Sequence, residues 1–269
     1  AQAIAQSKAI IAGQKTAPVD TSVLLAGLLM QQGDAAQAMQ VIEKALESQP
    51  SDLGLLLIAA QVSTEGASNT ETAAKAAGFY KRATQAAPKN AELWTAWALH
   101  HVRRNELDAA EAVLRESVRA QPGDERRTLA LLDFMGSRRG VDAAEKEFLA
   151  AIAAKPKDSK LRFGLVNLYR SANRGADAQR VLQDIVEIDK EGPGGLSARN
   201  QLAAQAYAVK HVARARQLTE EVLKLSPRDA DALLLRGRLS LDEGNPQTAV
   251  IDLRSAAKDK PGSVEVAGL

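Results

Sequence analysis

The sequence of 269 residues contains no cysteine, which excludes disulfide frameworks, cysteine zinc sites, iron–sulfur clusters and thiol catalysis. Aromatic residues make up only 3%. Alanine and leucine must therefore supply most of the core packing, which favours closely packed helices over a β-sandwich. No apolar run approaches the roughly 18 residues that span a bilayer, so we expect no membrane-spanning segment. The absence of cysteine does not indicate the cellular compartment, because a cysteine-free chain is compatible with oxidising and reducing environments.

Neither sign of charge dominates the chain. Lys and Arg together number 35 and Asp and Glu 33, which gives a net charge of +2 and excludes a bulk polycation or polyanion. The charges are unevenly distributed, however. Residues 101–216 carry 21 basic and 16 acidic side chains, whereas residues 1–100 carry 7 and 8, and residues 217–269 carry 7 and 9.

Seven of the nine prolines recur in a register that indicates internal repeats. The intervals between them are 32, 38, 34, 34, 71 and 34 residues, and the gap of 71 divides into two ordinary intervals if Lys190 takes the place of a proline. Most of these prolines precede a polar pair with Asp, Asn or Ser. Because proline ends a helix and those residues cap the next one, the pattern predicts helical hairpins. The prolines are Pro18, Pro50, Pro88, Pro122, Pro156, Pro227 and Pro261.

Residues 91–122 form the clearest repeat. Trp94, Trp97 and Ala98 recur at helical spacing, a turn follows around Asn105, and a second amphipathic helix comes after it. This segment resembles the tetratricopeptide repeat, a helical hairpin of 34 residues with a preferred residue type at several fixed positions. The residues at those positions are Trp94, Trp97, Ala98, His101, Asn105, Ala110, Leu114, Ser117 and Pro122.

The resemblance extends over seven tandem repeats and implies an all-α fold, a right-handed superhelical α-solenoid of stacked helix-turn-helix hairpins. We expect residues 1–269 to form a single solenoid. Residues 1–17 are expected to be the second helix of a truncated repeat and residues 262–269 the start of a further one. Together with the missing initiator methionine, these ends predict a fragment of a longer array, with a signal peptide absent or already removed. The predicted repeats are 19–50, 53–88, 91–122, 125–156, 159–190, 196–227 and 230–261.

Two stretches depart from the regular spacing. Thr64–Thr70 lengthens the turn inside the second repeat, and Glu191–Gly195 lengthens the junction between the fifth and sixth repeats. The second stretch is rich in glycine and proline, and it is compatible with either a hinge or a tolerated loop insertion.

Motifs of catalysis and cofactor binding are missing. There is no H-E-x-x-H, no P-loop and no G-x-S-x-G, and the three histidines are scattered. His101 occupies the aromatic position of its repeat, and Trp94 and Trp97 occupy core positions, so all three are interpreted as packing residues. We therefore predict no enzymatic activity, no cofactor and no metal.

The resemblance implies a binding site in the concave groove, which is lined by the first helix of each repeat. The mixture of apolar, amide and arginine side chains there suits an extended peptide or a partner helix. The residues that match groove positions are Arg126, Leu129, Asp133, Lys160, Phe163, Asn167, Arg170, Asn200, Tyr207 and Arg238, together with Thr95, Leu99 and Leu234.

Several arginines fall near the ends of first helices, where stacked repeats would align them along one edge. Cations at a helix C-terminus also complement the helix dipole, so a purely structural role competes with a binding role. The predicted basic edge consists of Arg103, Arg104, Arg138, Arg139 and Arg174.

The leading interpretation is a non-catalytic scaffold that binds a partner protein or peptide. Repeats rich in Ala and Arg and free of Cys resemble bacterial arrays of exopolysaccharide assembly and export systems, which implies the periplasm or cell envelope and leaves the cytoplasm open. Direct binding of an anionic polysaccharide or another polyanion along the basic edge is the alternative. Self-association through uncapped ends is a third interpretation. Nucleic acid is not expected, because aromatic side chains are not interleaved with the basic ones.

Overall fold

The structure of the chain is a computed structural model that describes residues 2–12, 18–65 and 70–259. Within these ranges the regular structure consists of 15 α-helices and one short π-helix, without any β-strand. The chain divides into two compact units, unit 1 (residues 1–138) and unit 2 (residues 139–269). The predicted all-α fold of helix-turn-helix hairpins is confirmed, while the right-handed sense of the superhelix stays a prediction.

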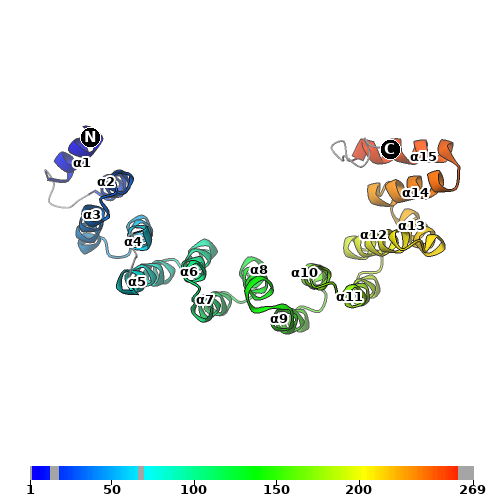
Figure 1. Ribbon diagram of the computed structural model, residues 1–269, viewed down its shortest axis with the longest axis horizontal. Coiled ribbons are helices and arrows are strands. Elements are labelled where there is room, and N and C mark those ends of the chain that lie inside the picture. Colours follow the sequence, from blue (N-terminus) through cyan, green and yellow to red (C-terminus); the bar gives the residue numbers. More distant parts are fainter. Residues whose placement is uncertain (1, 13–17, 66–69, 260–269) are drawn as a thin grey trace. The chain divides into compact units, whose positions relative to one another are not determined.

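Unit 1 consists of eight α-helices in which successive helices pair as hairpins, α2 with α3, α4 with α5 and α6 with α7 (Figure 1). A π-helix, Met135–Arg139, follows the last of them. The helices are α1 (Gln2–Ala12), α2 (Val19–Gln31), α3 (Ala35–Ser48), α4 (Leu53–Glu65), α5 (Thr70–Ala86), α6 (Ala91–Arg103), α7 (Leu107–Ala120) and α8 (Glu125–Phe134).

Unit 2 repeats the same plan, with close packing of α10 on α11, α12 on α13 and α14 on α15. The helices are α9 (Val141–Ala154), α10 (Ser159–Ser171), α11 (Gly175–Ile188), α12 (Pro193–Ala208), α13 (Val212–Leu225), α14 (Ala230–Asp242) and α15 (Pro246–Asp259).

The polar residues after the repeat prolines cap the first helix of the next hairpin, as the sequence predicts. The side chain of Asn90 accepts a hydrogen bond from Glu92 N at 3.0 Å, and that of Asp124 accepts one from Arg126 N at 3.0 Å. Such a cap satisfies an amide that has no partner within the helix and stabilises the helix by about 1 kcal/mol. The residues that act in this way are Asp52, Asn90, Asp124, Asp158 and Asp229.

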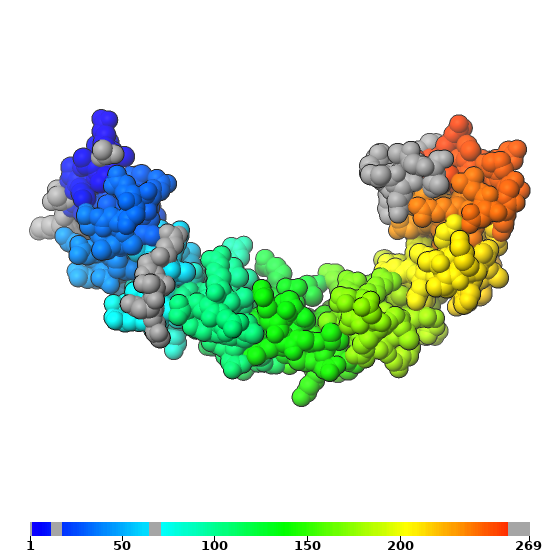
Figure 2. Space-filling view, viewed as in Figure 1, coloured from blue at the N-terminus to red at the C-terminus, as the bar shows by residue number. Residues whose placement is uncertain are grey.

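Small residues at equivalent positions let the two helices of each hairpin approach closely. Ala110 on α7 and Ala144 on α9 are fully buried, and the same holds for the alanine at that position in other hairpins. Figure 2 shows side chains filling the spaces that separate the ribbons of Figure 1. Buried alanines at these positions agree with the expectation that alanine supplies much of the core packing. The alanines are Ala38, Ala76, Ala110, Ala144, Ala178, Ala215 and Ala249.

The Glu191–Gly195 stretch is not a loop throughout, because α12 begins within it at Pro193. Proline at the first helical position lacks only an amide that would be unpaired anyway. The side chain of Asp189 accepts hydrogen bonds from Gly194 N at 2.7 Å and Gly195 N at 3.2 Å. The extra residues therefore lengthen a helix, which corrects the expectation of a loop insertion. In the other irregular stretch, Thr64–Thr70, residues 66–69 lie outside the described residues. The predicted start of a further repeat, residues 262–269, also lies outside them.

Candidate functional site

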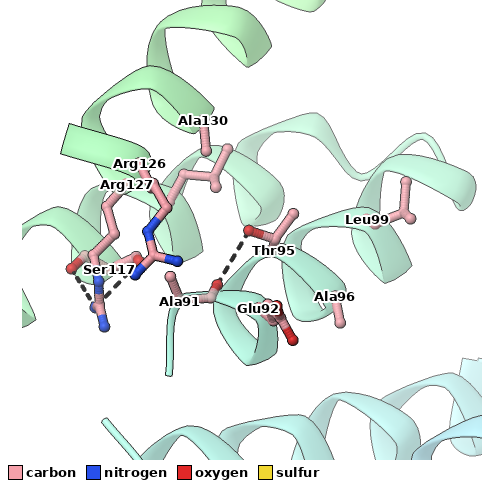
Figure 3. Close-up of a pocket in the computed structure, with 10 residues that line it drawn as sticks. Ala91, Glu92, Thr95, Ala96, Leu99, Ser117, Arg126, Arg127 and Ala130 are labelled. Carbon is pink, nitrogen blue, oxygen red and sulfur yellow. Dashed lines mark hydrogen bonds between the residues drawn. The ribbon is translucent and has the colours of Figure 1, made fainter. Parts of the chain in front are cut away.

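The first candidate site is a cavity of about 420 Å³ in unit 1, between α6 and α8 (Figure 3). Leu99 on α6 and Arg126 on α8 lie at this cavity, and both are predicted groove residues. Leu99 is 45% exposed although it is a large apolar side chain. The lining residues are Ala91, Glu92, Thr95, Ala96, Leu99, Leu114, Ser117, Arg126, Arg127 and Ala130.

The spacing of residues on α6 decides which side chains reach the cavity. Trp94, Trp97 and Ala98 are buried on one face of the helix, which confirms their interpretation as core residues. Thr95 and Leu99 are four residues apart and lie together on the exposed face. The polar atom of Trp94 is satisfied within the core, because its Nε1 donates a hydrogen bond to the carbonyl oxygen of Pro88 at 3.1 Å.

Arg127 is a buried arginine beside the cavity, and it was not identified from the sequence. Its side chain is 1% exposed. Nη2 donates to the carbonyl oxygen of Pro88 at 2.6 Å, and Nη1 donates to that of Ser117 at 2.8 Å. The guanidinium carbon also lies 5.8 Å from the centroid of the Trp94 ring. Arg127 therefore joins α8 to the third hairpin and to the end of the second, while its neighbour Arg126 is 82% exposed at the cavity.

The second candidate site is a cavity of about 300 Å³ in unit 2, between α12 and α14. The predicted groove residues Asn200, Leu234 and Arg238 lie at this cavity. Asn200 Nδ2 donates a hydrogen bond to Asp229 Oδ1 at 2.9 Å, which fixes the amide at the wall. The lining residues are Ser197, Asn200, Gln201, Ala204, Asp231, Leu234, Leu235 and Arg238.

The remaining predicted groove residues line neither cavity. Leu129 and Asp133 are exposed on α8, and Lys160, Asn167 and Arg170 are exposed on α10, where Phe163 is partly buried. Tyr207 on α12 is partly buried, and its hydroxyl donates a hydrogen bond to Asp242 Oδ2 at 2.8 Å. That hydrogen bond raises the pKa of Tyr207 above its ordinary value. The prediction of one groove over all these residues stays a prediction.

Arg174 is the centre of an ion-pair network in unit 2. Its Nη1 donates to Glu145 Oε2 at 2.6 Å and its Nε donates to Asp177 Oδ2 at 2.6 Å. Tyr169 Oη donates to Glu145 Oε1 at 2.8 Å, and the Arg174 guanidinium carbon lies 4.5 Å from the centroid of the Tyr169 ring. Burial and the hydrogen bond to Glu145 raise the pKa of Tyr169 to about 12. The network ties α9 to α10 and to the start of α11.

The predicted basic edge therefore contains arginines in different environments. Arg103 and Arg138 are exposed, whereas Arg104 Nε lies 2.9 Å from Glu106 Oε1 and Arg174 belongs to the network above. Arg139 is partly buried and has an interaction partner. A guanidinium that already pairs with a carboxylate offers less to a polyanion. Binding of a polyanion along this edge stays a prediction.

Two of the three histidines, His100 and His101, pack against each other, with 5.4 Å between ring centroids. His100 is 3% exposed, its Nδ1 lies 3.2 Å from Thr64 Oγ1, and burial lowers the pKa of His100 below its ordinary value. His101 lies next to Trp97, with 6.3 Å between ring centroids and the rings tilted by 40°. Among the described residues no cluster of three or more His, Asp or Glu side chains is arranged to hold a metal ion. None of the helices in the described ranges is both long and apolar enough to cross a membrane.

Comparison with protein families supports the repeat assignment. A family described as ChAPs (Chs5p-Arf1p-binding proteins) matches residues 1–129, and the tetratricopeptide repeat family matches residues 200–264. Together with the helical hairpins of both units, the match over residues 200–264 fits a tandem array of tetratricopeptide repeats. Arrays of this fold generally act as non-enzymatic scaffolds for protein–protein interactions.

Similar individual proteins are distant in sequence. The cellulose synthase operon protein C of Xanthomonas axonopodis pv. citri (strain 306) is 26% identical over 182 residues, which cover 65% of this chain and 12% of that protein. The chain thus spans only a small part of this relative. The structure of yeast Tom70 aligns with a TM-score of 0.51 at 16% identity, covering 92% of this chain and 51% of that one. A tetratricopeptide repeat protein from Parabacteroides merdae ATCC 43184 aligns with a TM-score of 0.42 at 17% identity, covering 91% and 94%.

Proposed function

We propose that the chain is a non-catalytic scaffold that binds a partner protein or peptide along the first helices of its hairpins. One observation carries the proposal: residues at predicted groove positions line a cavity in each unit, Thr95, Leu99 and Arg126 in unit 1 and Asn200, Leu234 and Arg238 in unit 2. Concave sites with an apolar floor and a few polar groups are where proteins bind peptides and small ligands.

The cavity in unit 1 suits an apolar side chain of a partner. Leu99, Ala96 and Ala130 provide apolar surface, and Glu92 and Arg126 place one charge of each sign at the site. A Leu or Phe side chain of a partner would cover Leu99, and burial of such a side chain contributes about 1.5–3 kcal/mol. The two charges would orient polar groups that flank the apolar anchor.

The cavity in unit 2 suits the backbone of an extended segment. The Asn200 side chain lines the cavity and donates its Nδ2 hydrogen bond to Asp229. Its carbonyl oxygen is therefore held in place as an acceptor for a backbone N–H of a bound peptide.

We further propose that the scaffold serves an exopolysaccharide assembly or export system in the bacterial cell envelope. The supporting observation is the similarity to the cellulose synthase operon protein C of Xanthomonas axonopodis pv. citri, whose name places it in the operon of a polysaccharide synthase. In this role the chain would hold an enzyme or export component of the system, and the chemistry would belong to that partner.

Site-specific photo-crosslinking in the native organism tests the proposal. A photoreactive amino acid replaces Leu99 or Ala204, each exposed beside one of the two cavities, and Leu149 on α9 serves as the control because it is 50% exposed and lines neither. We expect one protein to be crosslinked from both cavity positions and not from position 149. If that protein belongs to a polysaccharide system, the pathway is supported. Equal crosslinking at all three positions would contradict binding at the cavities.

A further inference from the structure

A cleft of about 250 Å³ lies in unit 2 beside α11, α12 and α13, and it shares no lining residue with the two cavities above. Because α12 packs against both α11 and α13, all three helices contribute side chains to one site. The lining residues are Gln179, Gln183, Leu202, Gln205, Ala206, Val209, His211, Arg214 and Leu218.

Three glutamines give this cleft its chemistry. Gln179 and Gln183 lie four residues apart on α11 and therefore on one face, and Gln205 comes from α12. Their carboxamide groups form no hydrogen bond or ion pair within the part of the chain that the structure describes. Each carboxamide has donors and an acceptor that are free for a ligand.

An imidazole and a guanidinium complete the polar wall. His211 precedes the first turn of α13, and its side chain makes no capping hydrogen bond to that helix. Arg214 Nη1 donates to Gln217 Oε1 at 2.9 Å, which leaves the other guanidinium donors available. No Asp or Glu is among the residues that line the cleft. The cleft also has an apolar part, because Leu202, Ala206 and Leu218 line it and are buried.

This combination matches the hydroxyl groups and ring faces of a sugar. A hydroxyl both donates and accepts hydrogen bonds, as a carboxamide does, whereas a phosphate or carboxylate only accepts and favours clusters of arginine or lysine. The C–H face of a sugar ring fits an apolar floor. At about 250 Å³, the cleft is smaller than the roughly 300–1,000 Å³ of typical ligand pockets, so it holds only a short stretch of chain.

We propose that this cleft, the glutamine cleft, binds a neutral saccharide, with Gln179, Gln183 and Gln205 as hydrogen-bonding residues. The site is separate from the peptide-binding cavities and does not rest on the function proposed for them. It gives unit 2 a direct contact with a glycan chain, and it uses amide side chains rather than the basic edge.

Isothermal titration calorimetry of the whole chain with neutral hexasaccharides tests the proposal. The probes are cellohexaose, xylohexaose and mannohexaose, with a hexamer of uronic acids as the charged comparison. We expect one neutral probe to bind the unaltered chain, and the double variant Gln179→Ala/Gln183→Ala to bind it at least tenfold more weakly. Both glutamines are exposed, and alanine favours a helix at least as well, so the variant keeps its fold.

Two control variants separate this site from the others. Gln40→Ala/Gln85→Ala removes two exposed glutamines from unit 1 and should leave saccharide affinity unchanged. Leu99→Asp, which alters the cavity between α6 and α8, should also leave it unchanged. The proposal is overturned if no neutral probe binds, if the Gln179/Gln183 variant binds as well as the unaltered chain, or if only the uronic acid hexamer binds and salt removes it.

Discussion

Arg126 and Arg127 are adjacent in the sequence, yet one side chain is 82% exposed and the other 1%. The buried guanidinium donates to two backbone carbonyls and lies 3.5 Å from Asp124 Oδ2. We expect Arg127→Ala to destabilise unit 1 by about 2–4 kcal/mol, because the substitution removes the guanidinium donor from both carbonyls, leaves that of Pro88 with Trp94 Nε1 as its remaining donor, and opens a cavity. Arg126→Ala should change stability by less than about 0.5 kcal/mol.

Urea unfolding monitored by tryptophan fluorescence measures this difference. The chain has two tryptophans, Trp94 and Trp97, and the first packs against Arg127. The signal therefore reports the region where the substitution acts. Equal midpoints for the two alanine variants would show that the buried guanidinium contributes nothing to stability.

The network around Arg174 should make the stability of unit 2 depend on pH. Hydrogen bonds from Arg174 and then Tyr169 lower the pKa of Glu145, and Arg174 likewise lowers the pKa of Asp177. A carboxyl whose pKa is lower in the folded state stabilises the fold above its ordinary pKa of about 4. That contribution is lost as the pH falls through the lowered pKa. We therefore expect Glu145→Gln to be less stable than the unaltered chain at pH 7, with the difference shrinking below about pH 4.

Thermal unfolding followed by circular dichroism over a pH series checks this expectation. Glu187→Gln, at an exposed position on α11, is the matched control and should not alter the pH profile. A constant difference between Glu145→Gln and the unaltered chain at every pH would contradict the linkage. The sequence could not predict this network, because Glu145 precedes Arg174 by 29 residues and the two meet only when the hairpins pack.

At the scale of helices, the start of α12 depends on glycine at position 195. A Cβ atom there would lie 2.9 Å from the carbonyl oxygen of Lys190 and would collide with the carbonyl of Asp189. We expect Gly195→Ala to destabilise unit 2 by about 1–3 kcal/mol, because the backbone must shift to admit the methyl group. Gly175→Ala at the start of α11 meets open space and should be neutral or stabilising by up to about 1 kcal/mol. Chemical denaturation of both variants measures their stabilities. A similar loss of stability in both would contradict the close approach of position 195 to the backbone of Asp189 and Lys190.

The crossing of α6 and α7 depends on Ala110, which is fully buried. Ala110→Leu adds three carbon atoms to a closely packed contact and should destabilise the chain by about 1–3 kcal/mol. Ala112→Leu on the same helix is the control, because Ala112 is exposed and the larger side chain points to solvent. Unchanged thermal stability of Ala110→Leu would argue against the repeat alignment.

Most of the helices could be predicted from the sequence, because each is marked by local signals. Pro88 and Asn90, for example, separate α5 from α6, and Asn105 adopts the left-handed conformation (φ 59°) in the turn before α7. The start of α12 was not predicted because its glycines are typical of a loop, whereas in the structure the amides of Gly194 and Gly195 donate to the side chain of Asp189. The candidate cavities were predicted only in part. The repeat resemblance places Leu99 and Asn200 at groove positions, but the depth of a cavity between two helices depends on how the surrounding side chains pack.

At the scale of the whole chain, the two units differ in the chemistry they offer. The cavity of unit 1 is lined mainly by leucine and alanine, with Glu92, Arg126 and the buried Arg127 as its charged residues, whereas unit 2 carries amide side chains at both of its sites. Nearly equal numbers of basic and acidic residues and a regular repeat therefore do not produce a uniform surface. A partner with an apolar anchor favours unit 1, and a ligand rich in hydrogen-bonding groups favours unit 2.

The division into two compact units also has a consequence for unfolding. Repeats contact mainly their sequence neighbours, so a local loss of stability spreads over few hairpins. Both tryptophans lie in unit 1, while helices in both units contribute to circular dichroism. We expect Gly195→Ala to lower the unfolding midpoint measured by circular dichroism and to leave the fluorescence midpoint unchanged, whereas Ala110→Leu lowers both. If Gly195→Ala shifts the two midpoints equally, the chain unfolds as one cooperative body, because a defect at α12 then reaches the tryptophans of α6.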